Sequence, residues 1–186
     1  SGMLAPALAT MLVVLTTDAV VEAGDADAAL RAATRTTFDR IDSDGAMSTS
    51  DTVALLASGA SGRTVDRATL AAALTEACAS LARQLIADAE GATHDIAVRV
   101  LHAQTEDAAV AVARAVTRSN LLKAAIFGND PNWGRVLAQV GTVPVEVAAS
   151  DADALDVAIN GVQVCRAGGV GEPRDLVDLA SHREVH

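Results

Sequence analysis

Residues 65–89, with the sequence VDRATLAAALTEACASLARQLIADA, carry the clearest structural pattern in this chain of 186 residues. Apolar residues recur in this segment every three or four positions, which is the spacing of one face of an α-helix: Leu70, Leu74, Ala77, Leu81 and Leu85. Gly91 follows where a glycine commonly ends a helix. The pattern predicts one long helix over residues 65–89.

Strand and helix patterns alternate on both sides of this helix. Residues 11–17 (MLVVLTT) are apolar and β-branched and predict a buried strand, and residues 25–40 predict a helix. Residues 52–57 are apolar and fit either a strand or a short helix. Beyond the long helix, residues 107–118 and 134–140 predict helices, and residues 96–101, 143–147 and 155–164 predict strands. Asn160-Gly161 is a hairpin signal within the last of these. The order of elements predicts an α+β fold.

Composition narrows the classes of function. The chain carries a net charge of −10 and has no basic run, so it would repel a phosphate backbone, and no nucleic acid is expected as a partner. The longest apolar run, residues 11–15, is too short to span a bilayer, so no membrane association is expected. Cys78 and Cys165 lie far apart in the sequence. They are expected to be buried, reduced thiols in a cytoplasmic protein.

Motifs for cofactor or metal chemistry are weak. No phosphate-binding glycine loop occurs, and the four histidines lack the spacing of metal ligands. Gly45 would place Asp42, Asp44 and Asp51 at calcium-ligand positions, but Arg40 would then occupy the first ligand position. This segment is therefore predicted to be a turn with Asx hydrogen bonds, and neither a metal nor a cofactor is expected.

Thr10, at the start of the first predicted strand, has two interpretations. It can be a β-branched strand residue without a chemical role. If the chain were cut before Thr10, its hydroxyl would lie beside its own α-amine, whose pKa of ~7.7–8 suits a general base. The residues around Thr10 do not decide between the two.

Four segments, in order along the chain, resemble motifs of the ornithine acetyltransferase family. They are residues 2–12 (GMLAPALATML) with 15–19 (LTTDA), 48–52 (STSDT), 88–93 (DAEGAT) and 127–135 (FGNDPNWGR). The first resembles the family's self-cleavage segment, and the last resembles its most recognisable motif. The resemblance covers nearly the whole chain.

The resemblance implies an αββα sandwich of the type found in N-terminal-nucleophile enzymes. It also implies self-cleavage between Ala9 and Thr10, with residues 1–9 as the precursor segment and residues 10–186 as a C-terminally truncated β-chain domain. Thr10 would take the acetyl group from N2-acetyl-L-ornithine and pass it to L-glutamate in arginine biosynthesis. Some family members also use acetyl-CoA as donor. The family implies no metal or cofactor, and assembly with an α chain from the same precursor into an α2β2 heterotetramer.

Glu90 matches a glutamate of the family that contacts the substrate, so the resemblance implies that it binds the amino acid. Without the family, Glu90 would be interpreted as an exposed residue beside the helix-ending Gly91. In the FGNDPNWGR motif a structural role is predicted, with Asp130 as helix N-cap, Pro131 at the first helical position and Trp133 in the core. A substrate role for Asn132 or Arg135 is the weaker alternative.

Parts of the family pattern are absent from this sequence: a substrate-contacting lysine, the α portion with its oxyanion-hole Thr-Gly pair, and the C-terminal tail. The isolated chain is therefore expected to be inactive. Two alternatives stay open. The same scaffold can serve other acyl chemistry, as in secondary-metabolism acetyltransferases or aminopeptidases, or the chain can be a binding module without an acyl-threonine intermediate.

Overall fold

The computed structural model describes residues 10–43, 45 and 48–186 and divides the chain into two compact units. The first unit ends at Glu90, and the second comprises Gly91–His186. Ala9 and the rest of the predicted precursor segment lie outside the described residues, as does Asp44. Helices and strands are both present, which confirms the predicted α+β class.

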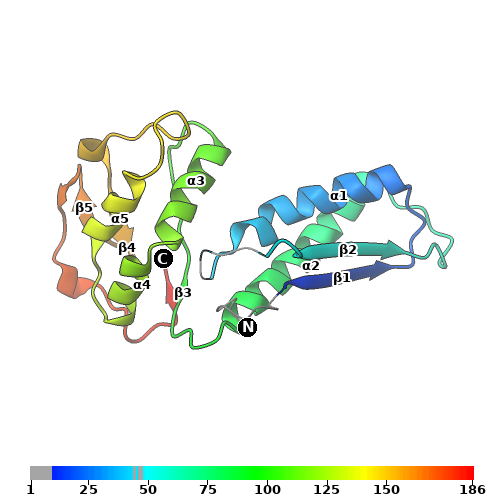
Figure 1. Cartoon of the computed structure of the whole chain (residues 1–186), viewed down its shortest axis with the longest axis horizontal. Coiled ribbons are helices and arrows are strands. Elements are labelled where there is room, and N and C mark those ends of the chain that lie inside the picture. Colours follow the sequence, from blue (N-terminus) through cyan, green and yellow to red (C-terminus); the bar gives the residue numbers. More distant parts are fainter. Residues whose placement is uncertain (1–9, 44, 46–47) are drawn as a thin grey trace. The chain divides into compact units, whose positions relative to one another are not determined.

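The first unit consists of two strands and two long helices. Strand β1 (Leu12–Thr17) pairs in parallel with β2 (Thr52–Ala57), with Leu12 opposite Thr52 and Thr17 opposite Ala57. Helix α1 (Ala23–Thr36) follows β1, and α2 (Arg67–Ala87) follows β2. Figure 1 shows both helices lying along the strands. The ambiguous residues 52–57 therefore form a strand, and the predicted long helix is confirmed with slightly shorter ends.

The core of the first unit lies between the helices and one face of the sheet. A cluster of buried side chains fills this space: Val13, Ala29, Ala33, Phe38, Leu70, Leu74, Cys78 and Ala82. Four of them come from α2 and are spaced four residues apart. Ala77 is exposed and Leu85 is 37% exposed, so the face predicted from the leucines was displaced by one residue toward Cys78 and Ala82. Small side chains at these positions let α1 approach α2 closely.

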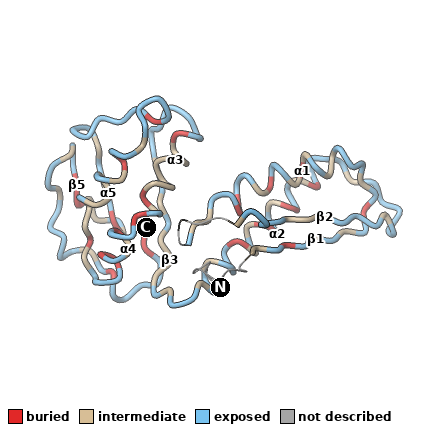
Figure 2. The backbone as a smooth tube through the Cα atoms, viewed as in Figure 1, coloured by how far each residue is buried: buried red, intermediate tan, exposed pale blue. Residues whose placement is uncertain are grey.

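The other face of the sheet is open. Leu12, Val14 and Leu56 are 73%, 63% and 59% exposed, whereas Val13 is buried (Figure 2). The prediction of a buried strand at residues 11–17 is thus confirmed for one face and wrong for the other. Helices cover only the side that carries Val13, because successive side chains of a strand point to opposite faces.

Residues 25–40 do not form one continuous helix. Helix α1 ends at Thr36, and a short 3₁₀ turn, Phe38–Arg40, follows. The buried Thr37 hydroxyl donates a hydrogen bond to the Ala33 carbonyl oxygen over 2.7 Å. The turn places Phe38 in the core.

The second unit holds three shorter helices and small sheets. The helices are α3 (Glu106–Thr117), α4 (Asn120–Phe127) and α5 (Trp133–Val140). Strands β4 (Val157–Ile159), β5 (Val162–Arg166) and β6 (Gly169–Val170) form an antiparallel sheet, and β3 (Asp95–Ile96) pairs in parallel with β7 (Glu184–Val185). Short 3₁₀ turns occur at Ala152–Ala154 and Arg174–Leu176. The core contains Val116, Leu122, Ile126, Val140, Ile159, Val164, Leu179 and Val185.

In this unit the predicted hairpin is present, whereas two of the predicted strands are absent or shorter. The Asn160-Gly161 hairpin is confirmed, since both residues have the positive φ angles that its turn needs (48° and 85°). Residues 143–147 form a turn instead of a strand, because the Pro144 carbonyl oxygen accepts hydrogen bonds from the N–H groups of Val147 and Ala148. The strand expected over residues 96–101 is limited to Asp95–Ile96.

Both cysteines are free and fully buried, as predicted. Burial raises the pKa of both thiols, so both are held as thiols rather than thiolates. Among the described residues, only α2 has the length and apolar composition that a membrane-spanning helix would need, and core helices of globular proteins often have both properties. Four of its residues belong to the core of the first unit.

Candidate active site

Thr10 lies two residues before the first residue of β1, at the amino end of the parallel strands, and is half-buried. Its position in the strand alternation is that of Leu12 and Val14, whose side chains point away from the helices. The other candidate, Ala9, lies outside the described residues. The structure thus places the predicted nucleophile at the edge of the open face.

A turn at residues 48–51 contacts Thr10. The Thr10 hydroxyl oxygen lies 3.2 Å from the hydroxyl oxygen of Ser48, 38 residues later in the chain. The backbone N–H of Ser50 donates to the same Ser48 oxygen over 3.2 Å. Ser48 is therefore held within its turn while its hydroxyl faces Thr10.

The carboxylate of Asp51 joins this turn to the beginning of β1. Its Oδ1 accepts a hydrogen bond from the Met11 N–H over 2.8 Å, and its Oδ2 accepts one from the Ser48 N–H over 3.2 Å. The N–H of Thr52 donates to the Met11 carbonyl oxygen over 2.9 Å, which starts the ladder between β1 and β2. Both polar groups of the Met11 backbone are thus bound.

Glu90 lies in an exposed turn after α2, just before Gly91, whose φ is 71°. Because α2 returns along the strand that precedes it, its carboxyl end lies at the amino end of the strands, as Thr10 does (Figure 1). The helix of 21 residues is about 31 Å long, whereas a six-residue strand spans about 20 Å. Helix α2 is therefore longer than the strand that it runs along. Within the described residues no hydrogen bond or ion pair joins Glu90 to Thr10.

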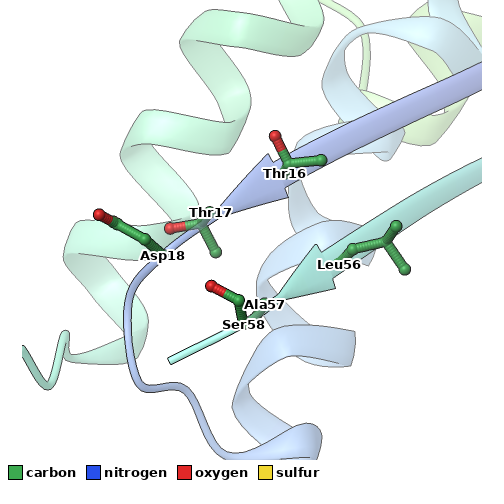
Figure 3. A pocket seen from close by; sticks show the side chains of 6 residues that line it. All are labelled: Thr16, Thr17, Asp18, Leu56, Ala57 and Ser58. Carbon is green, nitrogen blue, oxygen red and sulfur yellow. The ribbon is translucent and has the colours of Figure 1, made fainter. Parts of the chain in front are cut away.

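A shallow hollow of about 610 Å³ lies at the opposite end of the strands (Figure 3). Six residues line it: Thr16, Thr17, Asp18, Leu56, Ala57 and Ser58. The hydroxyl oxygens of Thr17 and Ser58 accept hydrogen bonds from the N–H groups of Ala19 and Ala60, so they already stabilise the local turns. Neither Thr10 nor Glu90 lines this hollow.

In the second unit, the FGNDPNWGR segment has structural contacts. The N-cap of α5 is Asn132, whose Oδ1 accepts from the Arg135 N–H over 3.3 Å, and not Asp130 as predicted. Asp130 instead accepts a hydrogen bond from the Asn132 side-chain amide over 2.9 Å and pairs with Arg174 at 3.3 Å. Arg135 donates to the carbonyl oxygen of Leu121. Trp133 is partly buried and packs against the core of this unit.

No group of three or more His, Cys, Asp or Glu side chains that could hold a metal ion occurs in the part of the chain that the structure describes. The turn predicted around Gly45 does form an Asx hydrogen bond, because Asp42 Oδ1 accepts from the Gly45 N–H over 2.8 Å. The ring nitrogens of His94 lie within hydrogen-bond distance of the Thr93 hydroxyl and the Leu179 carbonyl oxygen.

Ser48 and Asp51 are the site residues that the sequence did not identify individually. The sequence identifies the STSDT segment only as a family motif, and the one role weighed for its residues, Asp51 as a calcium ligand, was not favoured. A partial signal was present, because a serine followed three residues later by an acidic residue often forms reciprocal side-chain and backbone hydrogen bonds. That signal does not reveal a contact with Thr10.

Comparisons with known proteins agree on one family. A model described as the ArgJ family matches residues 1–185. The arginine biosynthesis bifunctional protein ArgJ of Streptomyces avermitilis is 62% identical over 186 residues, and that of Bifidobacterium longum is 58% identical over 186. The match covers the whole of this chain but 48% and 47% of those proteins, so the chain spans about half the length of the curated relatives it matches.

A solved structure has a similar fold. The crystal structure of the arginine biosynthesis bifunctional protein ArgJ from Bacillus halodurans superposes with a TM-score of 0.80 at 36% identity. The superposition covers 89% of this chain and 79% of that one.

Proposed function

This chain belongs to the ArgJ family, and from that premise we propose that it supplies the nucleophile of an acetyltransferase of arginine biosynthesis. In this proposal the chain is cut between Ala9 and Thr10, and Thr10 then carries the acetyl group from N2-acetyl-L-ornithine to L-glutamate. Acetyl-CoA as a second donor belongs to the same proposal. The observation that carries it is the Thr10 hydroxyl, bound by the Ser48 hydroxyl at the head of β1.

The chemistry suits a threonine at a new amino terminus. The free α-amine would have a pKa of ~7.7–8 and can take the proton of the adjacent hydroxyl at neutral pH. An acetyl-Thr10 intermediate divides one amide-to-amide transfer into two acyl transfers, which predicts ping-pong kinetics. Each transfer passes through an oxyanion that needs hydrogen-bond donors. The resemblance assigns these donors to the α chain.

Glu90 is proposed to bind the amino acid substrate. Its carboxylate is exposed at the end of α2, and this end of the helix lies at the same end of the strands as Thr10. A carboxylate forms charge-assisted hydrogen bonds with an ammonium group, such as those of ornithine and glutamate.

The αββα sandwich and the partner chain are proposed together. The open face of the β1–β2 sheet exposes three large apolar side chains, Leu12, Val14 and Leu56, and contiguous exposed apolar surface is typical of protein interfaces. A second sheet from the rest of an ArgJ protein would cover it and complete the sandwich. Two α chains and two β chains would then assemble into an α2β2 heterotetramer. We also propose that this chain alone is inactive, because the oxyanion donors would come from that partner. The free, buried thiols support a cytoplasmic location.

Intact mass spectrometry of a full-length ArgJ protein that contains this sequence tests the proposal. Before substrate is added, a fragment that begins at Thr10 is expected. After N2-acetyl-L-ornithine is added, this fragment should gain the mass of one acetyl group, and it should lose it again with L-glutamate. Thr10→Ala should show neither cleavage nor acetylation. A wild-type protein that stays uncut, or is cut but never acetylated, would refute the acetyltransferase assignment.

A further inference from the structure

Two residues of the 48–51 turn bind the segment that leads into β1 in different ways. Ser48 reaches the Thr10 hydroxyl, and Asp51 binds the backbone N–H of Met11. We infer that Ser48 is a further catalytic residue, which donates a hydrogen bond to the reacting oxygen of Thr10. Asp51 is a positioning residue that fixes both partners. The inference deepens the proposed function and rests on it.

The hydrogen-bond pattern of Ser48 leaves its hydrogen available for the contact with Thr10. A serine hydroxyl has one hydrogen to donate and two lone pairs to accept with. One lone pair of Ser48 is used by the Ser50 N–H, so its hydrogen remains to be donated. The Thr10 oxygen, 3.2 Å away, is the partner that the structure places there.

This contact matters in both halves of the reaction. In the first, the Thr10 oxygen bonds to the acetyl carbon, and the bond from that carbon to the substrate nitrogen breaks. The hydroxyl proton passes through the Thr10 α-amine to the departing amine. In the second, the neutral amine nitrogen of glutamate bonds to the acetyl carbon and the carbon–oxygen bond to Thr10 breaks. The proton that this nitrogen loses passes through the Thr10 α-amine to the Thr10 oxygen. Ser48 keeps its own proton throughout and stabilises the charge that develops on the Thr10 oxygen.

Asp51 holds the segment around Thr10 in place. Once the chain is cut, Thr10 becomes the first residue, and chain ends are poorly ordered unless they are held. One carboxylate binds the residue after Thr10 and, through the Ser48 N–H, the turn that presents the hydroxyl. Together with the bond from the Thr52 N–H to the Met11 carbonyl oxygen, this fixes the distance between the two hydroxyl groups.

The test uses Ser48→Ala, Ser48→Thr and Asp51→Ala in a full-length ArgJ protein that contains this sequence. Ser50→Ala is the matched control, because it removes a hydroxyl from the same turn but keeps the backbone N–H that binds Ser48. Steady-state rates with N2-acetyl-L-ornithine and L-glutamate, the rate of self-cleavage and the melting temperature are measured for each variant.

Ser48→Ala should lower kcat by about 10- to 100-fold, with KM changed less than about twofold, since the lost bond acts on the reacting oxygen. Ser48→Thr should restore the rate to within about threefold of wild type, because it keeps a hydroxyl. Asp51→Ala should slow both cleavage and transfer, and Ser50→Ala should do neither.

An unchanged kcat in Ser48→Ala, equal losses in Ser48→Ala and Ser48→Thr, or a similar loss in Ser50→Ala would each overturn the inference. In these cases an active wild-type protein would leave the proposed function standing. A wild-type protein that neither cleaves nor transfers would instead overturn the proposed function, and the inference with it.

Discussion

Glu90 is the residue whose role depends most on its family resemblance, because it has no partner near Thr10 within the described part of the chain. If it binds the ammonium group of the substrate, Glu90→Gln removes the charge but keeps the shape. We expect KM for N2-acetyl-L-ornithine to rise by about tenfold, with kcat changed by less than about twofold, because the contact is made equally in the bound and the transition state. Steady-state kinetics of the full-length protein measures both constants.

Glu76→Gln is the matched control for this experiment. Glu76 is an exposed glutamate within α2, the helix that precedes Glu90, and lies 14 residues before Glu90 in the sequence. Its variant should keep the wild-type KM. If Glu90→Gln also keeps it, Glu90 returns to the simpler interpretation of an exposed residue after a helix.

At the scale of the elements, small, fully buried side chains of α1 and α2 contribute to the core of the first unit. Ala33 of α1 and Cys78 of α2 are both fully buried and belong to the same core cluster. A leucine at position 33 would need space that neighbouring side chains occupy, so Ala33→Leu should lower the free energy of unfolding by about 1–3 kcal/mol. Ala32→Leu, at the exposed neighbouring position, should change it by less than about 0.5 kcal/mol. Urea denaturation of both variants checks the difference, and equal effects would contradict the packing argument.

The start of α2 should make stability depend on pH. Asp66 is its N-cap and accepts hydrogen bonds from the Thr69 N–H (3.0 Å) and hydroxyl (2.7 Å). The hydroxyl bond, then the N–H bond, lowers the pKa of the Asp66 carboxyl by favouring its charged form. The folded state therefore binds this proton less readily than the unfolded state does. The stabilisation is complete above the pKa of the unfolded chain and is lost as the pH falls through the lower pKa of the folded chain.

We therefore expect Asp66→Ala to lower the melting temperature by about 2–5 °C at pH 7 and by much less near pH 2. Asp66→Asn should cost little at pH 7, because asparagine also caps helices well. Its melting temperature relative to Asp66→Ala should not vary with pH, because neither of these side chains titrates. Thermal melts of the three proteins at both pH values provide the measurement. A deficit for Asp66→Ala that is the same at both would show that the carboxylate charge is not involved.

Sequence patterns predict the positions of several elements but not which of their faces are buried. The positions of α1, α2 and α3 follow from helical periodicity, and the Asn160-Gly161 turn follows from its two residues. The exposed face of β1 could not be predicted, because a wholly apolar strand has the same pattern whether one face or both are covered. The buried stripe of α2 was displaced because hydrophobicity favours Leu81 and Leu85, whereas close helix packing favours the smaller Cys78 and Ala82.

At the candidate active site, sequence motifs identify residues but not the contacts between them. Thr10 and Glu90 were identified from motifs, but the contact from Thr10 to Ser48 joins residues 38 positions apart. Its existence depends on the parallel register of β1 and β2, and residues 52–57 fitted a helix as well as a strand. Local patterns therefore identify which residues are candidates, whereas the register determines which of them meet.

At the scale of the whole molecule, the open face of the β1–β2 sheet leads to the last prediction. Leu56 is 59% exposed there, so Leu56→Lys should disturb the fold of this chain little. In the full-length protein the proposed sandwich would bury the lysine against a second sheet, where an unpaired charge is costly. We expect this variant to lose most of its self-cleavage and its assembly with the α chain, as measured by mass spectrometry and by size-exclusion chromatography with light scattering.

Val145→Lys is the control, because Val145 is also strongly exposed, at 72%, but lies in a turn of the second unit. It should cleave and assemble like wild type. In the isolated chain, Leu56→Lys should self-associate less than Val145→Lys. The reason is that Leu56→Lys interrupts an apolar surface that would otherwise favour self-association. Normal cleavage and assembly of the Leu56→Lys protein would show that this face stays in water, and the sandwich would then have to be built on another surface.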